Sequence, residues 1–333
     1  MNASTEWPCP ALSEADLGPR TTMRIGGRIQ WLLEPSSPQE FGEAWRASLE
    51  LGIKPMVIGG GANLLIEDGD FDGVVISTER LRRIFRPSGD DAPDENVLEA
   101  GDPQHLIALP DPAKDPRIIA WAGATIPGLV RAARDLKLSG VEGLIGVPGQ
   151  IGGGIAMNAG GKWGDMWDVV ERIFVLESDG SESMLERDEC SPTYRNGGLG
   201  DRILMGAVLR FEPAPKPLIE ERMRTFLLEK NSVQPVTESS CGCIFKNPDP
   251  ELSEGRSAGK LIDDCGGKSL SRGAALVSPL HANFIINTGG AKAADVWGLV
   301  EDIQARVADQ TGVQLSIEVR RWVGHEGELR AFV

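Results

Sequence analysis

Short apolar runs broken by glycine, proline and polar residues make up most of the first 80 positions. Residues 29–33, 55–58 and 73–77 are predicted strands, because each is a short apolar run with turn-forming residues nearby. Residues 39–51 have the apolar spacing of a helix, and Gly52 marks its end. Strands and helices that alternate in this way indicate a mixed α and β fold.

The same alternation continues in the middle of the chain. Residues 117–123, 170–178 and 203–211 are predicted strands, with a hairpin between the last two, and residues 126–137 are a predicted helix. Three prolines then follow at alternating positions, and they predict a linker: Pro213, Pro215 and Pro217.

The region after this linker has elements of its own. Residues 219–229 are a predicted helix and residues 315–323 a predicted strand. Between them lies a clearer helix that ends at Gly312. Its apolar positions fall on one face at 3.6-residue spacing: Val296, Leu299, Val300, Ile303 and Val307.

Residues 86–115 interrupt the pattern. They contain several prolines and glycines, and eight acidic residues against two basic ones. This composition predicts an excursion on the protein surface. The alternative interpretation is a lid over a functional site.

Composition and charge exclude several classes of protein. The 333 residues are 41% hydrophobic and 25% charged, which is typical of a folded protein with a core. The net charge of −15 argues against a nucleic-acid surface or docking on anionic lipid, but not against small anionic ligands. No signal peptide and no run of about 20 apolar residues is found, so we expect a cytoplasmic protein. Separately, we expect it to act as a monomer.

The five cysteines predict neither disulfides nor a metal site. Their number is odd and their spacing irregular, which does not suit a disulfide framework. Cys241 and Cys243 are separated by one residue, and none of the three histidines lies at ligand spacing from them.

Two glycine-rich segments are the strongest chemical signal. In residues 57–65, an apolar run leads into three consecutive glycines, whose N–H groups could form a nest for a pyrophosphate or simply a tight turn. Residues 146–161 are also dense in glycine, which suggests backbone packed closely against a flat ligand or another backbone. Neither segment matches a P-loop or a Rossmann fingerprint. We interpret them as an unusual scaffold for a dinucleotide-like ligand.

These segments, in this order, resemble the FAD-binding domain of the vanillyl-alcohol oxidase type. More narrowly, nearly the whole chain resembles the UDP-N-acetylenolpyruvoylglucosamine reductase family. Nine motifs in family order carry this resemblance: residues 21–27, 59–61, 122–124, 146–161, 194–196, 242–248, 258–262, 281–284 and 317–320. The short segment between Arg195 and Ile203 is similar to the shorter version of the family, which lacks an extra substrate loop.

The resemblance implies a fold and an activity. The fold would be α+β, with FAD-binding subdomains in residues 1–80 and 81–214 and a substrate-binding domain in residues 215–333. The activity would be the reduction of UDP-N-acetylglucosamine enolpyruvate to UDP-N-acetylmuramate, with tightly but non-covalently bound FAD and with NADPH as hydride donor. The implied FAD-binding residues are Gly59, Gly60, Gly61, Ala62, Asn63, Leu64, Gly123, Gly146, Val147, Pro148, Gly149, Gly152, Gly153, Asn158, Ala159 and Gly160.

Three residues match the family's catalytic motifs. Charge builds on the substrate's α-carbon and carboxylate during reduction, and Arg195 would stabilise it with its planar guanidinium. Glu318, predicted in the final strand, would lie on the other side of the carboxylate, which predicts a raised pKa for its side chain.

Cys243 is the departure from the family, which commonly has serine at this position. A thiol is a better acid than a hydroxyl, with an ordinary pKa of about 8.5, so it can donate a proton to the α-carbon. The alternative is that Cys243 fills space in an inactive site.

Other residues have weaker assignments. The resemblance places Lys246, Asn247, Gln234 and Tyr194 at the substrate, although Tyr194 could instead only pack. His281 fits a structural role better, because the mechanism leaves no role open for it. Trp163 and Trp167 could cover the flavin, but core packing is the better interpretation.

Two other functions remain open from the sequence. One is a different flavin oxidoreductase of the same fold, such as an oxidase with covalently attached FAD. The other is a non-catalytic protein that binds flavin or a nucleotide sugar. An oxidase would consume NADPH with oxygen alone, whereas a binding protein would be yellow but inert.

Overall fold

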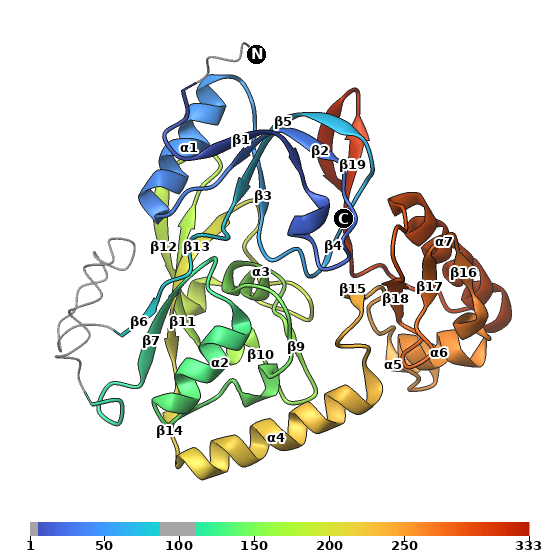
Figure 1. Ribbon diagram of the computed structural model, residues 1–333. Helices are drawn as coiled ribbons and strands as arrows, with labels where there is room; N and C mark the ends of the chain where they lie inside the picture. Colours follow the sequence, from blue (N-terminus) through green and yellow to red (C-terminus); the bar gives the residue numbers. More distant parts are fainter. Residues whose placement is uncertain (1–5, 87–110, 333) are drawn as a thin grey trace. The chain divides into compact units, whose positions relative to one another are not determined.

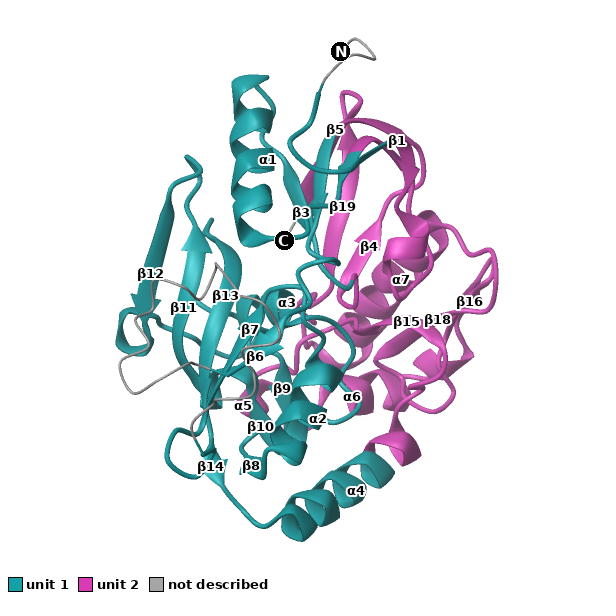
Figure 2. Ribbon diagram, turned by 60° about the vertical axis from the view of Figure 1, so that its left-hand side comes forward, with its two compact units in different colours: residues 1–12, 32–60, 74–229 teal, residues 13–31, 61–73, 230–333 magenta. Residues whose placement is uncertain are grey.

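A computed structural model describes residues 6–86 and 111–332 (Figure 1). The chain divides into two compact units, coloured separately in Figure 2. Unit 1 comprises residues 1–12, 32–60 and 74–229, and unit 2 comprises residues 13–31, 61–73 and 230–333. The chain therefore passes from one unit to the other five times, after residues 12, 31, 60, 73 and 229.

Unit 1 is built on a five-stranded antiparallel sheet with the strand order β12-β11-β13-β7-β6. Its strands are β6 (Ile84–Phe85), β7 (Arg117–Trp121), β11 (Val170–Leu176), β12 (Glu182–Glu186) and β13 (Ile203–Arg210). Helices α2 (Ile126–Asp135) and α3 (Ile151–Ala156) pack on one face of this sheet and bury its main core. Successive side chains of a strand point to opposite faces of the sheet, so that Ile118 and Ala120 both point into this core.

The rest of unit 1 consists of shorter elements. Helix α1 (Pro38–Glu50) begins at Ser37, whose side chain accepts a hydrogen bond from the Glu40 N–H and so caps the helix. Strand β3 (Met56–Ile58) pairs in parallel with the second half of β5 (Asp70–Ser77). Two-residue strands form the pairs β8 (Leu138–Ser139) with β14 (Glu212–Pro213) and β9 (Gly160–Gly161) with β10 (Gly164–Asp165).

Unit 2 contains a four-stranded antiparallel sheet with the order β15-β18-β17-β16. Its strands are β15 (Ser239–Cys243), β16 (Ser271–Arg272), β17 (Ala275–Val277) and β18 (Phe284–Asn287). The same unit contains three helices, α5 (Pro250–Ser253), α6 (Ala258–Asp264) and α7 (Ala293–Thr311). Strand β4 (Leu64–Ile66) pairs in parallel with β19 (Arg320–His325), which pairs with β20 (Glu328–Phe332).

Four elements run across a boundary between the units. They are β1 (Ala11–Asp16), β2 (Arg28–Leu33), β5 and helix α4 (Lys216–Val233). The division into residues 1–80, 81–214 and 215–333 stays a prediction.

Most of the predicted helices and strands are present, with bounds that differ by a few residues. The last long helix is confirmed as α7, and Gly312 caps it with a left-handed φ of 74°. Helix α4 is longer than predicted, and the hairpin predicted between β11 and β13 contains the additional strand β12. The surface excursion predicted for residues 86–115 falls mostly outside the described residues.

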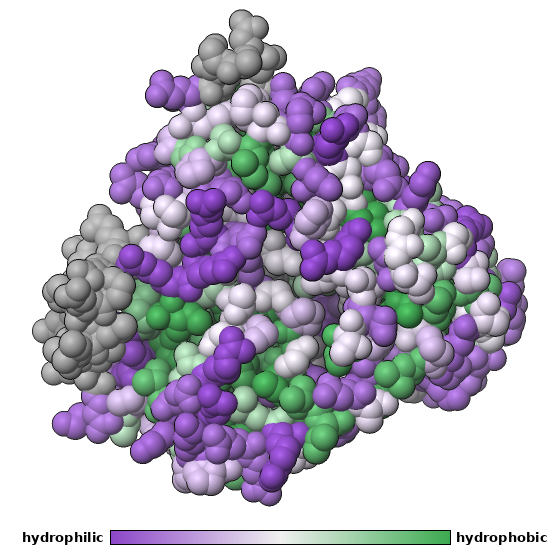
Figure 3. Space-filling view, viewed as in Figure 1, coloured by the Kyte–Doolittle hydropathy of each residue, from purple (hydrophilic) through white to green (hydrophobic). Residues whose placement is uncertain are grey.

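One prediction about local structure was wrong, and one helix was missed. Residues 315–323 are not one strand: apart from a single bridge at Ile317, the strand begins only at Arg320. The glycine-rich segment 146–161 contains a helix, α3, which we did not predict because glycine disfavours helices. The described helices include none that is both long and apolar enough to span a membrane. The face shown in Figure 3 is mostly hydrophilic, as the charged composition leads one to expect.

Candidate active site

In unit 1, the two glycine-rich segments lie against each other. Gly59 and Gly60 directly follow β3. A Cβ atom added at Gly60 would lie only 3.0 Å from the Cα atom of Gly149, so the two backbones are too close for most side chains. Next to this contact, the Thr78 hydroxyl donates a 2.7 Å hydrogen bond to Oε1 of buried Gln150. Close packing therefore disfavours a side chain at Gly60, and the φ of 107° at Gly149 favours glycine there as well.

The second glycine segment is also paired with the chain around Gly123. The Ile151 N–H donates to the Ala124 carbonyl, and the Gly152 N–H to the Ala122 carbonyl, each at 2.8 Å. A Cβ atom at Gly123 would lie 1.7 Å from the Thr78 carbonyl oxygen, so no other residue fits there. These hydrogen bonds and close contacts hold a stretch of glycine backbone, which carries no side chains, in a fixed position within unit 1.

Part of this backbone has open space beside it. Gly153, in α3, is exposed, and a Cβ atom added there would meet no protein atom within 4 Å. A flat ligand could approach the helix closely at this position. The glycine scaffold of unit 1 therefore fits the FAD that the sequence implies.

The remaining residues of the first glycine segment belong to unit 2. Gly61 has a φ of 58°, and an added Cβ atom would lie 2.3 Å from the Arg20 carbonyl oxygen, so only glycine is accommodated. The Thr22 hydroxyl contacts the Gly61 carbonyl at 3.2 Å and donates to the Ser240 carbonyl at 2.6 Å. Thr22 thus links the glycine segment to β15, the strand that carries Cys243. Sequence reasoning included Thr22 in a motif but gave it no role.

Arg195 lies at the corner of a tight turn in unit 1. Thr193 and Asn196 exchange backbone hydrogen bonds of 2.8 and 3.1 Å, and Arg195 between them has a left-handed φ of 58°. A long side chain in this conformation is strained, which is more common at functional sites than elsewhere. The ring of half-exposed Tyr194 lies 4.9 Å from the guanidinium carbon.

Backbone carbonyls orient the Arg195 guanidinium. Its Nη1 donates to the Asn158 carbonyl at 3.4 Å and its Nη2 to the Gly160 carbonyl at 3.0 Å. The Asn158 side chain accepts a hydrogen bond from the Trp167 N–H and donates to the Thr193 carbonyl, each at 3.2 Å. Asn158, which was predicted to bind FAD, therefore also connects the glycine segment to the turn that carries Arg195.

A carboxyl group lies in the same part of unit 1. Burial raises the pKa of Asp165 above its ordinary value, although Arg195 acts in the opposite direction.

The neighbouring loop is held to helix α4: the ring of Trp163 stacks on Phe226 with 4.8 Å between ring centroids, and Lys162 pairs with Glu229 at 2.7 Å. Trp167 is buried in the core, so packing is confirmed as the better interpretation of that residue.

A β-bulge directs Cys243 in unit 2. Ser240 pairs with Ile286 and Cys243 with Phe284, so that β15 has one residue more than β18 over this stretch. Gly242, inside the bulge, has a φ of 79°. Without the bulge, Cys241 and Cys243 would share a face; instead Cys241 is fully buried and Cys243 only half-buried. Burial raises the pKa of the Cys241 thiol to about 12.

Glu318 lies on the segment next to Cys243. The Glu318 N–H donates to the Ile244 carbonyl at 2.8 Å, and its own carbonyl accepts from the Asn63 side chain at 3.1 Å. Glu318 precedes β19 and is not in the final strand as predicted, because only one bridge, Phe245–Ile317, joins the two segments here. Unit 2 therefore brings Asn63, Cys243 and Glu318 into one region.

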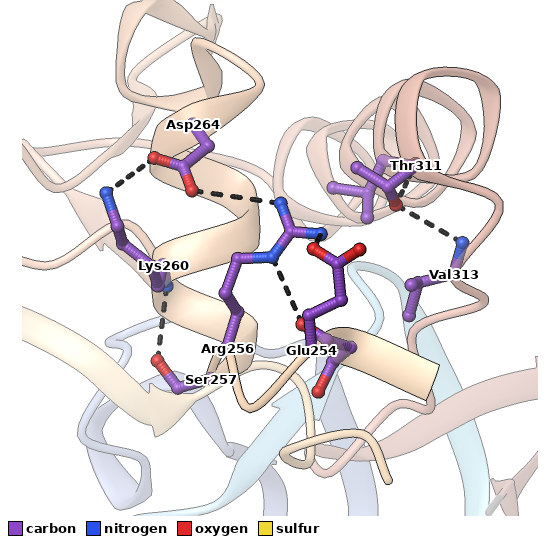
Figure 4. A network of polar contacts seen from close by, with 9 residues as sticks. Glu254, Arg256, Ser257, Lys260, Asp264, Thr311 and Val313 are labelled. Atoms are coloured by element: carbon purple, nitrogen blue, oxygen red, sulfur yellow. Dashed lines mark hydrogen bonds and ion pairs between the residues drawn. The ribbon is translucent and has the colours of Figure 1, made fainter. Parts of the chain in front are cut away.

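The residues predicted to contact substrate have different surroundings. The backbone N–H of Lys246 donates to the Ser316 carbonyl at 2.9 Å, and this hydrogen bond does not involve the ammonium group of the side chain. The Asn247 side chain accepts from the Ala258 N–H at 3.1 Å, at the start of α6. Figure 4 shows the polar network that holds this helix, in which Lys260 and Arg256 both pair with Asp264. Gln234 is half-buried at the end of α4, beside Pro235.

Comparisons with known proteins cover nearly the whole chain. Residues 29–184 match the model of an FAD binding domain, and residues 234–322 match that of the UDP-N-acetylenolpyruvoylglucosamine reductase C-terminal domain. UDP-N-acetylenolpyruvoylglucosamine reductase of Carboxydothermus hydrogenoformans is 33% identical over 312 residues, which is 93% of each chain. The reductase of Caulobacter vibrioides is 35% identical over 319 residues, or 95% of each chain.

The chain belongs to the UDP-N-acetylenolpyruvoylglucosamine reductase family. The crystal structure of the Thermus caldophilus reductase has a TM-score of 0.72 and 30% identity, and the match covers 94% of this chain and 98% of that one. The α+β fold with an FAD-binding part and a reductase C-terminal part, inferred from the sequence, is confirmed.

Within this reductase family assignment, the individual site residues stay predictions. Arg195 belongs to unit 1, whereas Cys243 and Glu318 belong to unit 2. His281 has the structural surroundings that we expected: it is half-buried, its Nδ1 accepts from the Asn283 N–H at 3.2 Å, and burial lowers the pKa of its ring. Asn283 itself was part of a motif, but its contacts could not be read from the sequence.

Proposed function

We propose that the protein reduces UDP-N-acetylglucosamine enolpyruvate to UDP-N-acetylmuramate in the synthesis of peptidoglycan precursors, with FAD as cofactor and NADPH as electron donor. The observation that carries this proposal is the similarity to reductases of this name over 93% of both chains. We further propose that it does so in the cytoplasm, as a monomer.

The glycine segments would hold the FAD. Gly59, Gly60, Gly123 and residues 146–153 form the glycine scaffold of unit 1, which leaves open space at Gly153, and residues 61–64 continue the first segment in unit 2. When bound, FAD supplies the transfer of two electrons from NADPH to the substrate. The polypeptide must then bind the substrate, stabilise developing charge and supply a proton.

In the overall reaction, the carbon–carbon double bond of the enolpyruvyl group becomes a single bond. The terminal carbon gains two electrons and a proton, the α-carbon gains a second proton, and NADPH is oxidised. Negative charge therefore develops at the α-carbon and the adjoining carboxylate before the second proton arrives.

Arg195 would bind this carboxylate. Because the Asn158 and Gly160 carbonyls already hold its guanidinium, Arg195 needs little reorganisation to meet the developing charge. Glu318 would lie on the other side of the carboxylate, as a protonated group that donates a hydrogen bond.

Cys243 would donate the proton to the α-carbon. Because of the bulge at Gly242, Cys243 is half-buried, whereas Cys241 points into the core. A thiol that has given up its proton becomes a thiolate, and solvent can protonate it again before the next turnover.

The proposal is tested by an assay with the authentic substrate. A yellow preparation should oxidise NADPH when UDP-N-acetylglucosamine enolpyruvate is added, and NADH should be the slower donor. Oxidation with oxygen alone would favour an oxidase, and a yellow protein that leaves the substrate unchanged would favour a binding protein.

Substitution of Cys243 tests the proton donor. Cys243→Ser should keep much of the activity, because a hydroxyl can replace the thiol, whereas Cys243→Ala should lose roughly 10²- to 10⁴-fold in kcat. Cys241→Ala is the matched control, since Cys241 is buried two residues away, and it should keep most of the rate. Equal activity of the Ser and Ala variants at position 243 would exclude Cys243 as the donor.

A further inference from the structure

The side chain of Asn283 makes an unusual pair of contacts close to Cys243. Asn283 is 3% exposed. Its Oδ1 accepts a hydrogen bond from the Phe245 N–H at 2.9 Å, and its Nδ2 donates to the Phe245 carbonyl at 2.8 Å. The Asn283 carbonyl also accepts from the Ile244 N–H at 2.9 Å. Three hydrogen bonds therefore join Asn283 to the two residues that follow Cys243.

These contacts continue a sheet where its regular pairing stops. Cys243 and Phe284 are the last pair between β15 and β18. On the other side of the segment 244–246, the Glu318 N–H donates to the Ile244 carbonyl and the Lys246 N–H to the Ser316 carbonyl. The N–H and carbonyl of Phe245 consequently point the opposite way, where the Asn283 amide takes the place of a peptide group.

Burial makes this replacement necessary. Phe245 is 1% exposed, so no water would pair its backbone groups if the Asn283 amide were absent. Two unpaired buried backbone groups are costly, and the segment 244–246 would shift to pair them elsewhere. Such a shift would reach Cys243 on one side and Glu318, through Ile244, on the other.

We infer that Asn283 is a positioning residue, which fixes the relative placement of Cys243 and Glu318 through the backbone of Ile244 and Phe245. This inference rests on the proposed function of those two residues. It predicts that loss of the Asn283 amide slows the reduction of the substrate and leaves the oxidation of NADPH by the protein intact. The reason is that Cys243 and Glu318 act only in the reduction of the substrate.

Asn287 offers a matched control. It is an asparagine at the other end of β18, it is 9% exposed, and its side chain also bonds backbone groups, donating to Met23 and accepting from Gly289 and Ala291. It makes none of the contacts to residues 244–246. A merely structural role of buried amides in this sheet would affect both asparagines alike.

The experiment compares Asn283→Ala with Asn287→Ala as holoenzymes of matched FAD content. Stopped-flow absorbance follows flavin reduction by NADPH, and separately the reoxidation of dithionite-reduced protein by the enolpyruvyl substrate. For Asn283→Ala, reoxidation should slow on the order of 10- to 100-fold with flavin reduction unchanged, as expected for a small misplacement of catalytic groups. Asn287→Ala should leave both rates near wild type.

A second readout does not depend on activity. Cys243 is the one half-buried cysteine among the five, all of which lie in the described residues, so iodoacetamide should label it first. The labelling rate at Cys243 should change several-fold in Asn283→Ala and remain constant in Asn287→Ala. If Asn283→Ala fails to fold, Asn283→Asp, which keeps the shape and one acceptor, should show the same selective slowing at neutral pH.

The outcomes separate this inference from the function on which it rests. If wild-type reduced flavin is not reoxidised by the substrate, the proposed function fails. If wild type reacts but Asn283→Ala slows both steps equally, reacts normally, or matches Asn287→Ala, then Asn283 is only a structural residue and the inference is overturned.

Discussion

Glu142 shows how a single buried carboxyl group stays ionised in this protein. It is 6% exposed, and burial alone would raise the pKa of its side chain. Hydrogen bonds from the Ser139 hydroxyl at 2.6 Å and the Gly140 N–H at 2.7 Å favour the charged form, and together with the smaller effect of Arg222 they outweigh burial. The net effect is a lowered pKa, so the folded state prefers the carboxylate.

This shift makes the stability of the fold depend on pH. Because the folded pKa lies below the unfolded one, the stabilisation is complete above the unfolded value and is lost as pH falls through the folded value. Glu142→Gln should reduce the free energy of unfolding at pH 7 by about 1 to 3 kcal/mol and leave little difference at acid pH. Thermal unfolding at pH 7 and near pH 3 checks this.

Glu238→Gln, at an exposed position, is the control and should alter neither measurement. A deficit in Glu142→Gln that is equally large at both pH values would contradict the argument, because an uncharged role for Glu142 would then explain it.

Among the elements, the bulge in β15 has the most direct link to the proposed chemistry. Gly242 adopts a φ of 79°, where a side chain costs about 1 to 2 kcal/mol. Gly242→Ala should therefore lower stability by roughly this amount and also displace Cys243, so that kcat falls in addition. Unfolding by urea and an NADPH assay measure the two effects.

Gly312→Ala separates the two effects. Gly312 has a φ of 74° at the end of α7, and an added Cβ atom would meet nothing within 4 Å. Its variant should lose similar stability and keep its full rate. A Gly242→Ala variant that is as active as Gly312→Ala would show that the bulge does not direct Cys243.

The same elements show what the sequence could and could not predict. Helix α7 was predictable, because five apolar positions repeat at helical spacing and a glycine ends it. The residues of the candidate site were found through family motifs. The bulge at Gly242 was not predictable, since it depends on pairing with β18, about 40 residues later in the sequence. Nor was the amide of Asn283, whose partner Phe245 is 38 residues away.

At the scale of the whole molecule, binding of FAD should contribute to stability. A ligand that binds only the folded protein stabilises it by about 2.7 kcal/mol at a hundredfold excess over its Kd. Removal of FAD should therefore lower the Tm by several degrees, and added FAD should restore it in proportion to the logarithm of its concentration. Differential scanning fluorimetry measures both.

Gly153→Val tests where the FAD binds. A Cβ atom added there would meet no protein atom within 4 Å, so the FAD-free variant should unfold near the wild-type temperature. It should nevertheless lose most of the stabilisation by FAD, because the side chain would occupy the open space beside α3. Undiminished stabilisation would remove Gly153 from the FAD-binding residues.

The repeated passage of the chain between the units has a consequence for biosynthesis. Arg320 at the start of β19 pairs with Leu64, which leaves the ribosome 256 residues earlier. At roughly 5 to 20 residues per second, β4 must wait on the order of 13 to 50 s for its neighbour. During this interval its edge is unpaired and open to other chains. Nascent chains should consequently depend on chaperones until the last strands have been translated.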